Sequence, residues 1–124
     1  MNKTNIFNLQ HTGKALTYAY KGLKAVFLSD VAFRQELLIL AASIPLAFYF
    51  GNTFFVRFLL VAVWVQVLIM ELINSAIETI IDRIGSEQHP LSGKAKEIGS
   101  ALIMVAAISA IITWVVIIIH KFLG

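Results

Sequence analysis

Three carboxylates and one amide recur along a single apolar stretch of the sequence. Glu71, Asn74, Glu78 and Asp82 are spaced three or four residues apart, so a helix with 3.6 residues per turn places them on one narrow face. The residues between them are mostly leucine and isoleucine. Acidic groups in or beside a bilayer are energetically costly and usually functional. This acidic stripe is therefore the candidate site of chemistry.

Carboxylates, an amide and nearby lysines are the groups that phosphoryl transfer requires. Mg²⁺ typically takes one or two carboxylates together with substrate phosphates. Glu71 lies deepest among apolar neighbours, and desolvation suits a carboxylate to accept a proton from a hydroxyl group. A structural pairing with a neighbouring helix is the alternative for Glu71. Metal binding and a solvated helix end are both open for Glu78 and Asp82, while Asn74 either orients a hydroxyl group or joins two helices.

The composition is that of an integral membrane protein. Of the 124 residues, 59% are hydrophobic and only 14% are charged, whereas about a quarter of an ordinary soluble domain is charged. We predict one all-α unit over residues 1–124, without a cleavable signal peptide. The absence of cysteine excludes disulfides and thiolate chemistry. The basic residues form no cluster of the kind that binds nucleic acid.

Hydrophobic periodicity predicts a surface helix followed by three membrane-spanning helices. Residues 11–28 carry an apolar face and a lysine-rich face, as in an amphipathic helix at the membrane interface; a solvated helix packed on the rest of the chain is the alternative. Ser29 or Asp30 then serves as the N-cap of the first span. We predict spans at about residues 30–50, 54–73 and 98–119, with the second helix continuing to residue 82.

Two polar segments connect these helices. Residues 51–53 form a tight turn, and residues 83–97 are predicted as a loop broken by Gly85, Pro90 and Gly93. Eight of the ten Lys and Arg residues lie within residues 1–36 or in the loop after the second span, against Arg57 and Lys121 on the other side. The positive-inside rule therefore places the N-terminus and this loop in the cytoplasm and the C-terminus outside.

The loop does not contain a phosphate-binding P-loop. Seven residues separate Gly85 from Gly93, and Ala95 follows Lys94, whereas that motif needs four residues and then Lys followed by Ser or Thr. A nucleotide must therefore bind at the membrane surface, between helices or between subunits. Three thin spans enclose a site poorly, so we expect a homo-oligomer.

Several motifs resemble those of the small prokaryotic diacylglycerol kinases, and the resemblance covers nearly the whole chain from about residue 11. The run from Arg83 to Gly93 points to the Gram-negative branch rather than to the related undecaprenol kinases. The segments that carry the resemblance are Glu71-Leu-Ile-Asn-Ser-Ala-Ile-Glu78, Asp82-Arg-Ile-Gly-Ser-Glu87, His89, Leu91-Ser-Gly93, Ala95-Lys96, Gly99-Ser-Ala101, Ala32-Phe-Arg-Gln-Glu36 and Lys21-Gly-Leu23.

The resemblance implies a homotrimer in the bacterial inner membrane, with a periplasmic C-terminus. Such enzymes transfer the γ-phosphate of Mg-ATP to the hydroxyl group of diacylglycerol and form phosphatidate. By the resemblance, Glu71 is the general base, Asn74 supports it, and Asp30 and Glu78 bind Mg²⁺. It places nucleotide contacts at His11, Tyr18, Asp30, Glu78, Glu87, Gln88, His89, Lys96 and Glu97. It places lipid contacts at Arg34, Gln35, Glu36, Glu71 and Ser100.

Four positions depart from the family pattern. Asp30 stands where glutamate is frequent and is one methylene shorter, which shifts the expected metal position. Glu97 stands where aspartate is usual. His11 replaces a frequent arginine, which puts a phosphate contact there in doubt, and Gln88 replaces an aromatic residue and removes a stacking contact.

Two other functions compete with diacylglycerol phosphorylation. A kinase acting on undecaprenol or another lipid alcohol would use the same carboxylates. A membrane scaffold or ion pathway would line a pore with Glu71 and Glu78. Against a pathway, the stripe covers only one end of the second span, and the third span has no ionisable group within the bilayer, whereas a pathway needs polar groups through the full depth.

Overall fold

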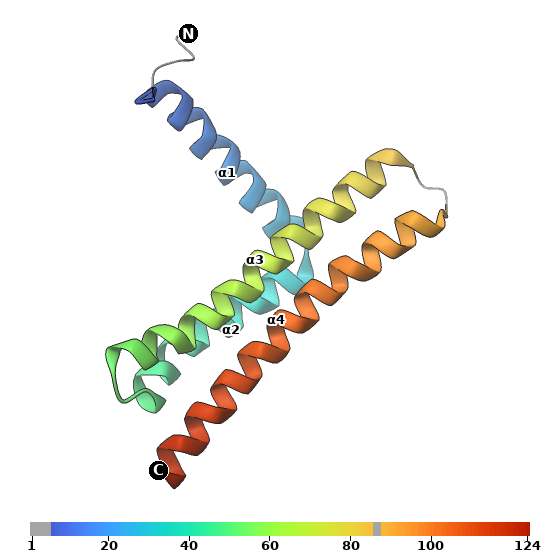
Figure 1. The fold of residues 1–124 in the computed structure, drawn as a ribbon. Helices are drawn as coiled ribbons and strands as arrows, with labels where there is room; N and C mark the ends of the chain where they lie inside the picture. The colour runs from blue at the N-terminus through green and yellow to red at the C-terminus, as the bar shows by residue number, and fades with distance from the viewer. Residues whose placement is uncertain (1–5, 86–87) are drawn as a thin grey trace.

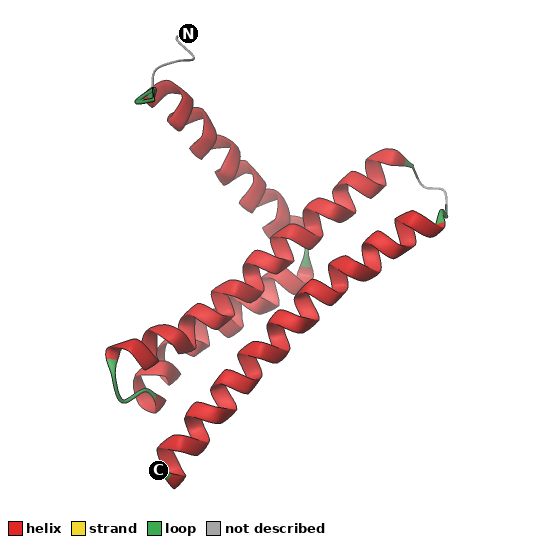
Figure 2. Ribbon diagram, viewed as in Figure 1, coloured by secondary structure: helices red, strands yellow, loops and turns green. Residues whose placement is uncertain are grey.

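A computed structural model describes residues 6–85 and 88–124, and within them it contains four helices and no strand (Figures 1 and 2). The predicted all-α class is confirmed. The helices are α1 (Leu9–Ser29), α2 (Val31–Phe50), α3 (Phe54–Ile84) and α4 (Pro90–Leu123). The last three are long and apolar enough to cross a membrane.

Helix α3 lies at the centre of the fold, with α2 and α4 packed against it. Helix α1 leaves this bundle at an angle and meets it near the junction with α2 (Figure 1). None of the residues of α1 is buried, and its apolar side chains Leu16, Tyr20 and Phe27 are exposed. No other described part of the chain covers the apolar face of α1. This favours a position of α1 at the membrane interface over packing of α1 on the bundle.

The junction between α1 and α2 decides which residue begins the first span. The Ser29 hydroxyl donates to the carbonyl oxygen of Ala25 and so remains part of α1. Asp30 adopts an extended conformation, and its side chain accepts hydrogen bonds from the first amides of α2. Asp30 is therefore the N-cap, because its carboxylate satisfies amides that have no partner within the helix.

Small residues let α3 and α4 approach closely. Val67 of α3 packs against Ala106 and Ala110 of α4, and all three are buried. Such residues are common where membrane helices pack, because short side chains bring the backbones together. Further along the same contact, the indole Nε1 of Trp114 donates to the carbonyl oxygen of Leu60 over 3.0 Å. These contacts hold α3 and α4 side by side.

The turn between α2 and α3 requires glycine at position 51. A Cβ atom there would lie 2.6 Å from Cγ of Arg57 and 2.8 Å from the carbonyl oxygen of Ala47. The short distance between Gly51 and Arg57 allows a hydrogen bond, in which Nε of Arg57 donates to the Gly51 carbonyl oxygen over 3.0 Å. Thr53 then caps α3 through a hydrogen bond from the amide of Val56.

The connection between α3 and α4 is shorter than the sequence predicts. The expectation of a loop as far as Glu97 is wrong, because α4 already begins at Pro90. Proline at the first helical position loses no hydrogen bond and has a suitable φ. Gly93 lies inside the helix, where glycine costs about 1 kcal/mol relative to alanine but does not break it.

Candidate active site

Asp30 connects the start of α2 to the acidic stripe on α3. Its Oδ1 accepts hydrogen bonds from the amides of Ala32 (3.0 Å) and Phe33 (3.3 Å). Its Oδ2 accepts a hydrogen bond of 2.9 Å from the hydroxyl of Ser75. One carboxylate therefore caps a helix and also fixes that helix against its neighbour.

These contacts keep Asp30 ionised. Burial by itself would raise the pKa of the Asp30 carboxyl, but hydrogen bonds with Glu71, Ser75 and the first two amides of α2 oppose it. Together they hold the pKa of Asp30 below its ordinary value. Hydrogen bonds to the charged form stabilise that form, so the Asp30 carboxyl is negatively charged at neutral pH and held in one orientation.

Glu71 forms the centre of a carboxyl cluster with Asp30 and Glu36. The Glu71 side chain is only 3% exposed and interacts with the carboxyl groups of both Asp30 and Glu36. Within the described part of the chain, Oε2 of Glu71 and Oε2 of Glu36 are buried without a hydrogen-bond partner. A buried acceptor without a donor costs roughly 1–3 kcal/mol. The carboxyl cluster thus has two oxygens ready to accept a hydroxyl proton or a cation.

Asn74 lies where Gly99 of α4 approaches the acidic stripe. It is 5% exposed, and its Nδ2 donates to Oε1 of Glu78 over 3.3 Å. It therefore supports a carboxylate of its own helix rather than joining two helices. A Cβ atom on Gly99 of α4 would lie only 2.1 Å from Oδ1 of Asn74, so glycine is required for this approach.

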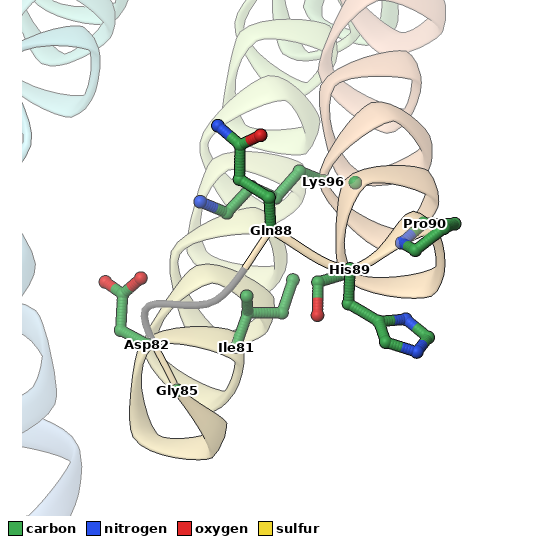
Figure 3. Close-up of a pocket in the computed structure, with 9 residues that line it drawn as sticks. Ile81, Asp82, Gly85, Gln88, His89, Pro90 and Lys96 are labelled. Atoms are coloured by element: carbon green, nitrogen blue, oxygen red, sulfur yellow. The ribbon is translucent and has the colours of Figure 1, made fainter.

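A polar cleft of about 730 Å³ opens between the end of α3 and the start of α4 (Figure 3). At 1.5 Å per residue, its Asp82 wall lies about 16 Å along α3 from Glu71. Three of the predicted nucleotide contacts, Gln88, His89 and Lys96, line it. The full lining is Ile81, Asp82, Gly85, Gln88, His89, Pro90, Ser92, Gly93 and Lys96.

His89 has a structural task that its position in the sequence did not reveal. Its Nδ1 accepts a hydrogen bond of 3.1 Å from the amide of Leu91, so it is the N-cap of α4. In Figure 3 its ring points away from Asp82 and Gln88. Only its second ring nitrogen is left for a ligand.

The other predicted nucleotide contacts are not gathered in this cleft. Tyr18 lines a shallow groove on α1 with Lys14 and Lys21. His11 is exposed on the same helix, and Glu97 is exposed on α4 outside the cleft. Glu87 lies outside the described residues. One chain therefore presents these predicted contacts on separate surfaces.

The predicted lipid contacts divide in a similar way. Glu36 belongs to the carboxyl cluster, whereas Gln35 and Ser100 are exposed. Nη1 of Arg34 donates to the carbonyl oxygens of Phe27 (2.6 Å) and Leu28 (3.2 Å) at the end of α1. Arg34 thus binds carbonyls that have no partner within their helix, which is a favourable position for a cation.

Two further residues shape the site and were not predicted. Ser75 follows Glu71 by one helical turn, so spacing alone could have placed it on the acidic face. Gly99 precedes Ser100 and Ala101, and such a run of small residues is the usual signal of a close helix contact.

The donor set fits a magnesium ion that also binds phosphate. The described residues contain no group of three or more acidic, His or Cys side chains able to hold a metal by themselves. Magnesium needs only one or two carboxylates when phosphate oxygens complete its shell. Asp30 binds Ser75, and Glu78 lies one turn further along α3. Both carboxylates retain lone pairs beyond their present hydrogen bonds, so they suit this arrangement.

Comparison with known proteins identifies the family. Residues 17–118 match the family described as prokaryotic diacylglycerol kinase. A protein named diacylglycerol kinase from Escherichia coli (strain K12) is 42% identical over 109 residues, which are 88% of this chain and 89% of that protein. Its namesake from Haemophilus influenzae is 41% identical over 106 residues, or 86% and 90% of the two chains. That from Pseudomonas aeruginosa is 42% identical over 105 residues, or 85% of each chain. The motifs, the helices and these matches agree, and the chain belongs to the prokaryotic diacylglycerol kinase family.

Proposed function

We propose that this chain is an ATP-dependent diacylglycerol kinase of the bacterial inner membrane, which transfers the γ-phosphate of Mg-ATP to diacylglycerol and forms phosphatidate. The observation that carries this proposal is the buried Oε2 of Glu71, which has no donor within the described chain. Family membership supplies the reaction class. The carboxyl cluster supplies a place where a lipid hydroxyl group can lose its proton.

Glu71 acts as the general base. The hydroxyl group of diacylglycerol donates to Oε2 of Glu71 and gives up its proton as its oxygen attacks the γ-phosphorus. The new oxygen–phosphorus bond forms while the bond from the γ-phosphorus to the bridging oxygen of ADP breaks, and ADP leaves. Glu71 then releases the proton to water. Burial at 3% exposure keeps competing water away from this carboxylate.

Asp30 and Glu78 are the residues that would hold a magnesium ion. The ion would supply positive charge to offset that of the phosphate oxygens. Ser75 fixes the Asp30 carboxylate, and Asn74 fixes the Glu78 carboxylate. The metal ligands are thereby oriented before nucleotide binds, which lowers the cost of reaching the transition state.

The cleft between α3 and α4 contributes to nucleotide binding. Lys96 supplies a cation for a phosphate, and Gln88 supplies an amide. His11, Tyr18 and Glu97 lie outside this cleft on the same chain, so we assign their contacts to a homotrimer in which a neighbouring copy completes the site. The N-terminus and this site face the cytoplasm, and the C-terminus faces the periplasm, as the distribution of Lys and Arg predicts.

A substrate-resolved assay tests the proposal directly. The purified protein in phosphatidylcholine bilayers is given labelled ATP and Mg²⁺ with diacylglycerol or with undecaprenol. We expect labelled phosphatidate and little labelled undecaprenyl phosphate. Transfer to undecaprenol alone would replace the substrate but leave the carboxyl mechanism intact, whereas transfer to neither lipid would refute the kinase.

Glu78→Gln tests the metal assignment. The amide keeps an oxygen for the hydrogen bond from Asn74 but removes the charge that binds Mg²⁺. We expect the Mg²⁺ concentration for half-maximal activity to rise by about tenfold to a hundredfold. Titration of Mg²⁺ at saturating lipid measures it.

Asp82→Asn is the matched control for Glu78→Gln. It removes the same charge from the next turn of α3, where the side chain is exposed on the wall of the cleft. We expect its Mg²⁺ requirement to stay close to that of the unsubstituted chain. An equal rise in both variants would show a general electrostatic effect rather than a ligand at Glu78.

A further inference from the structure

The end of the molecule opposite the carboxyl cluster carries only positive side-chain charge. All seven Asp and Glu residues of the sequence lie in the segments 30–36 and 71–97. Arg57 lies beside the turn between α2 and α3, and Lys121 lies near the end of α4. Figure 1 shows that turn and the C-terminal end of α4 at the same end of the fold. No acidic side chain of the sequence is available there to balance the two cations.

A cleft of about 520 Å³ lies between the turn and the end of α4. Asn52, Thr53, His120 and Lys121 line its polar part. Its apolar part includes valine and isoleucine side chains of the two helices, namely Val56, Val116 and Ile117. The cleft therefore combines polar donors with an aliphatic wall from the first turn of α3 and the last turns of α4.

Lys121 is held in place and keeps hydrogen-bond donors for a ligand. Its Nζ donates to the carbonyl oxygen of Tyr49 and lies 4.5 Å from the centre of the Tyr49 ring and 5.9 Å from that of Phe50. An ammonium group has three donors, and one of them is used here. The ammonium is thus preoriented at the cleft with two donors left for an anion.

The start of α3 adds to the positive character of this cleft. The amides of Val56 and Arg57 are occupied by Thr53, but the first turn of any helix has further amides without partners inside the helix. Those amides form the positive end of the helix dipole. Thr53 and Asn52 belong to the lining, so the cleft opens at this helix end.

We propose that this cleft binds the phosphate group of an anionic phospholipid, with one acyl chain against Val56, Val116 and Ile117. Charge complementarity selects an anion, because Lys121 and the N-terminus of α3 meet at a cleft whose described lining contains no acidic side chain. The aliphatic wall and the position at the end of the spans select a lipid rather than a soluble anion. This site lies in the leaflet opposite the carboxyl cluster and does not depend on the kinase assignment.

Trp114 provides a reporter for lipid in this cleft. Its indole is fixed by Leu60 and its ring centre lies 6.3 Å from that of Phe50, which lines the cleft. In a Trp64→Phe background Trp114 is the single tryptophan, and brominated lipids in contact quench its fluorescence. The protein is placed in mixed vesicles in which either phosphatidylglycerol or phosphatidylcholine is brominated. We expect phosphatidylglycerol to be preferred by about fivefold.

Substitutions in the cleft give the decisive comparison. Lys121→Gln together with His120→Gln should bring the preference to about one, whereas Lys121→Arg should keep it because the charge remains. Lys94→Gln, at the other end of α4, should leave it unchanged. Should the double variant fail to fold, as judged by circular dichroism, His120→Leu alone should still weaken the preference, because leucine has no hydrogen-bond donor and the Lys121 contact with Tyr49 stays intact.

Three outcomes would overturn the proposal. Equal quenching by the two lipids in the unsubstituted cleft would show that Lys121 merely extends to the membrane surface. A preference that survives in the folded double variant, or in His120→Leu where only that variant folds, would place the anionic lipid elsewhere. Displacement of phosphatidylglycerol by excess inorganic phosphate would show a site for soluble anions. Retained preference in the presence of phosphate supports the lipid.

Discussion

Replacing Glu71 with glutamine is expected to lower the rate of lipid phosphorylation by about 10²- to 10⁴-fold, the usual contribution of a general base. Glutamine preserves the shape of the side chain but cannot accept the hydroxyl proton. ATP binding should stay close to that of the unsubstituted chain, because the predicted nucleotide contacts are other residues. Turnover in phosphatidylcholine bilayers and nucleotide affinity, measured separately, distinguish the two effects.

Glu36→Gln is the appropriate comparison for Glu71→Gln. It neutralises the second carboxyl of the cluster, whose buried Oε2 also has no donor in the described chain, but leaves the proposed base in place. We expect a smaller loss, seen mainly in KM for diacylglycerol. Normal turnover in Glu71→Gln would remove Glu71 from the base role. A defect confined to ATP binding in both Glu71→Gln and Glu78→Gln would show that the two residues do not divide catalysis and metal binding.

Gly99→Ala is expected to destabilise the protein by about 1–3 kcal/mol and to lower its activity. The new Cβ atom would lie 2.1 Å from Oδ1 of Asn74 and 3.2 Å from its Cγ. The buried amide must therefore move, and its hydrogen bond to Glu78 is lost. Denaturant unfolding in mixed micelles measures the free energy of unfolding, and the Mg²⁺ titration should show a weaker metal site.

Gly93→Ala provides the matched control on the same helix. No atom outside its local backbone lies within 4 Å of a Cβ at that position, so alanine should stabilise the helix by about 0.5–1 kcal/mol. Adding Asn74→Ala to Gly99→Ala removes the clashing oxygen and should recover most of the lost stability. If Gly99→Ala alone raised stability as Gly93→Ala does, the tight contact between α4 and Asn74 would be refuted.

The acidic face of α3 could be predicted because it depends on residues close in sequence. Helical spacing placed Glu71, Asn74 and Glu78 together, and the structure joins the last two by a hydrogen bond. The partners of Glu71 could not be predicted from spacing. Its interactions with Asp30 and Glu36 depend on how α2 packs on α3. The bond from Ser75 to Asp30 joins residues 45 positions apart, which no local pattern contains.

The start of α4 shows how the same residue types can mislead. Pro90 and Gly93 were interpreted as helix breakers, but proline is favoured at the first turn of a helix and an isolated glycine only weakens one. The helix also has an N-cap in His89, whose ring nitrogen accepts the hydrogen bond from the Leu91 amide. Histidine is not among the most favoured N-cap residues, so composition alone gives no warning of this role.

The length of α3 sets the depth of Glu71 in the membrane. From Phe54, Glu71 lies about 26 Å along the helix axis, close to the roughly 30 Å thickness of the hydrocarbon layer. The remaining residues to Ile84 add about 20 Å, which extends beyond that layer. A hydroxyl group carried at the glycerol level of a lipid thus reaches the carboxylate without leaving the bilayer. We expect this enzyme to phosphorylate the hydroxyl group of diacylglycerol at this depth, and its rate to depend little on the length of the acyl chains below.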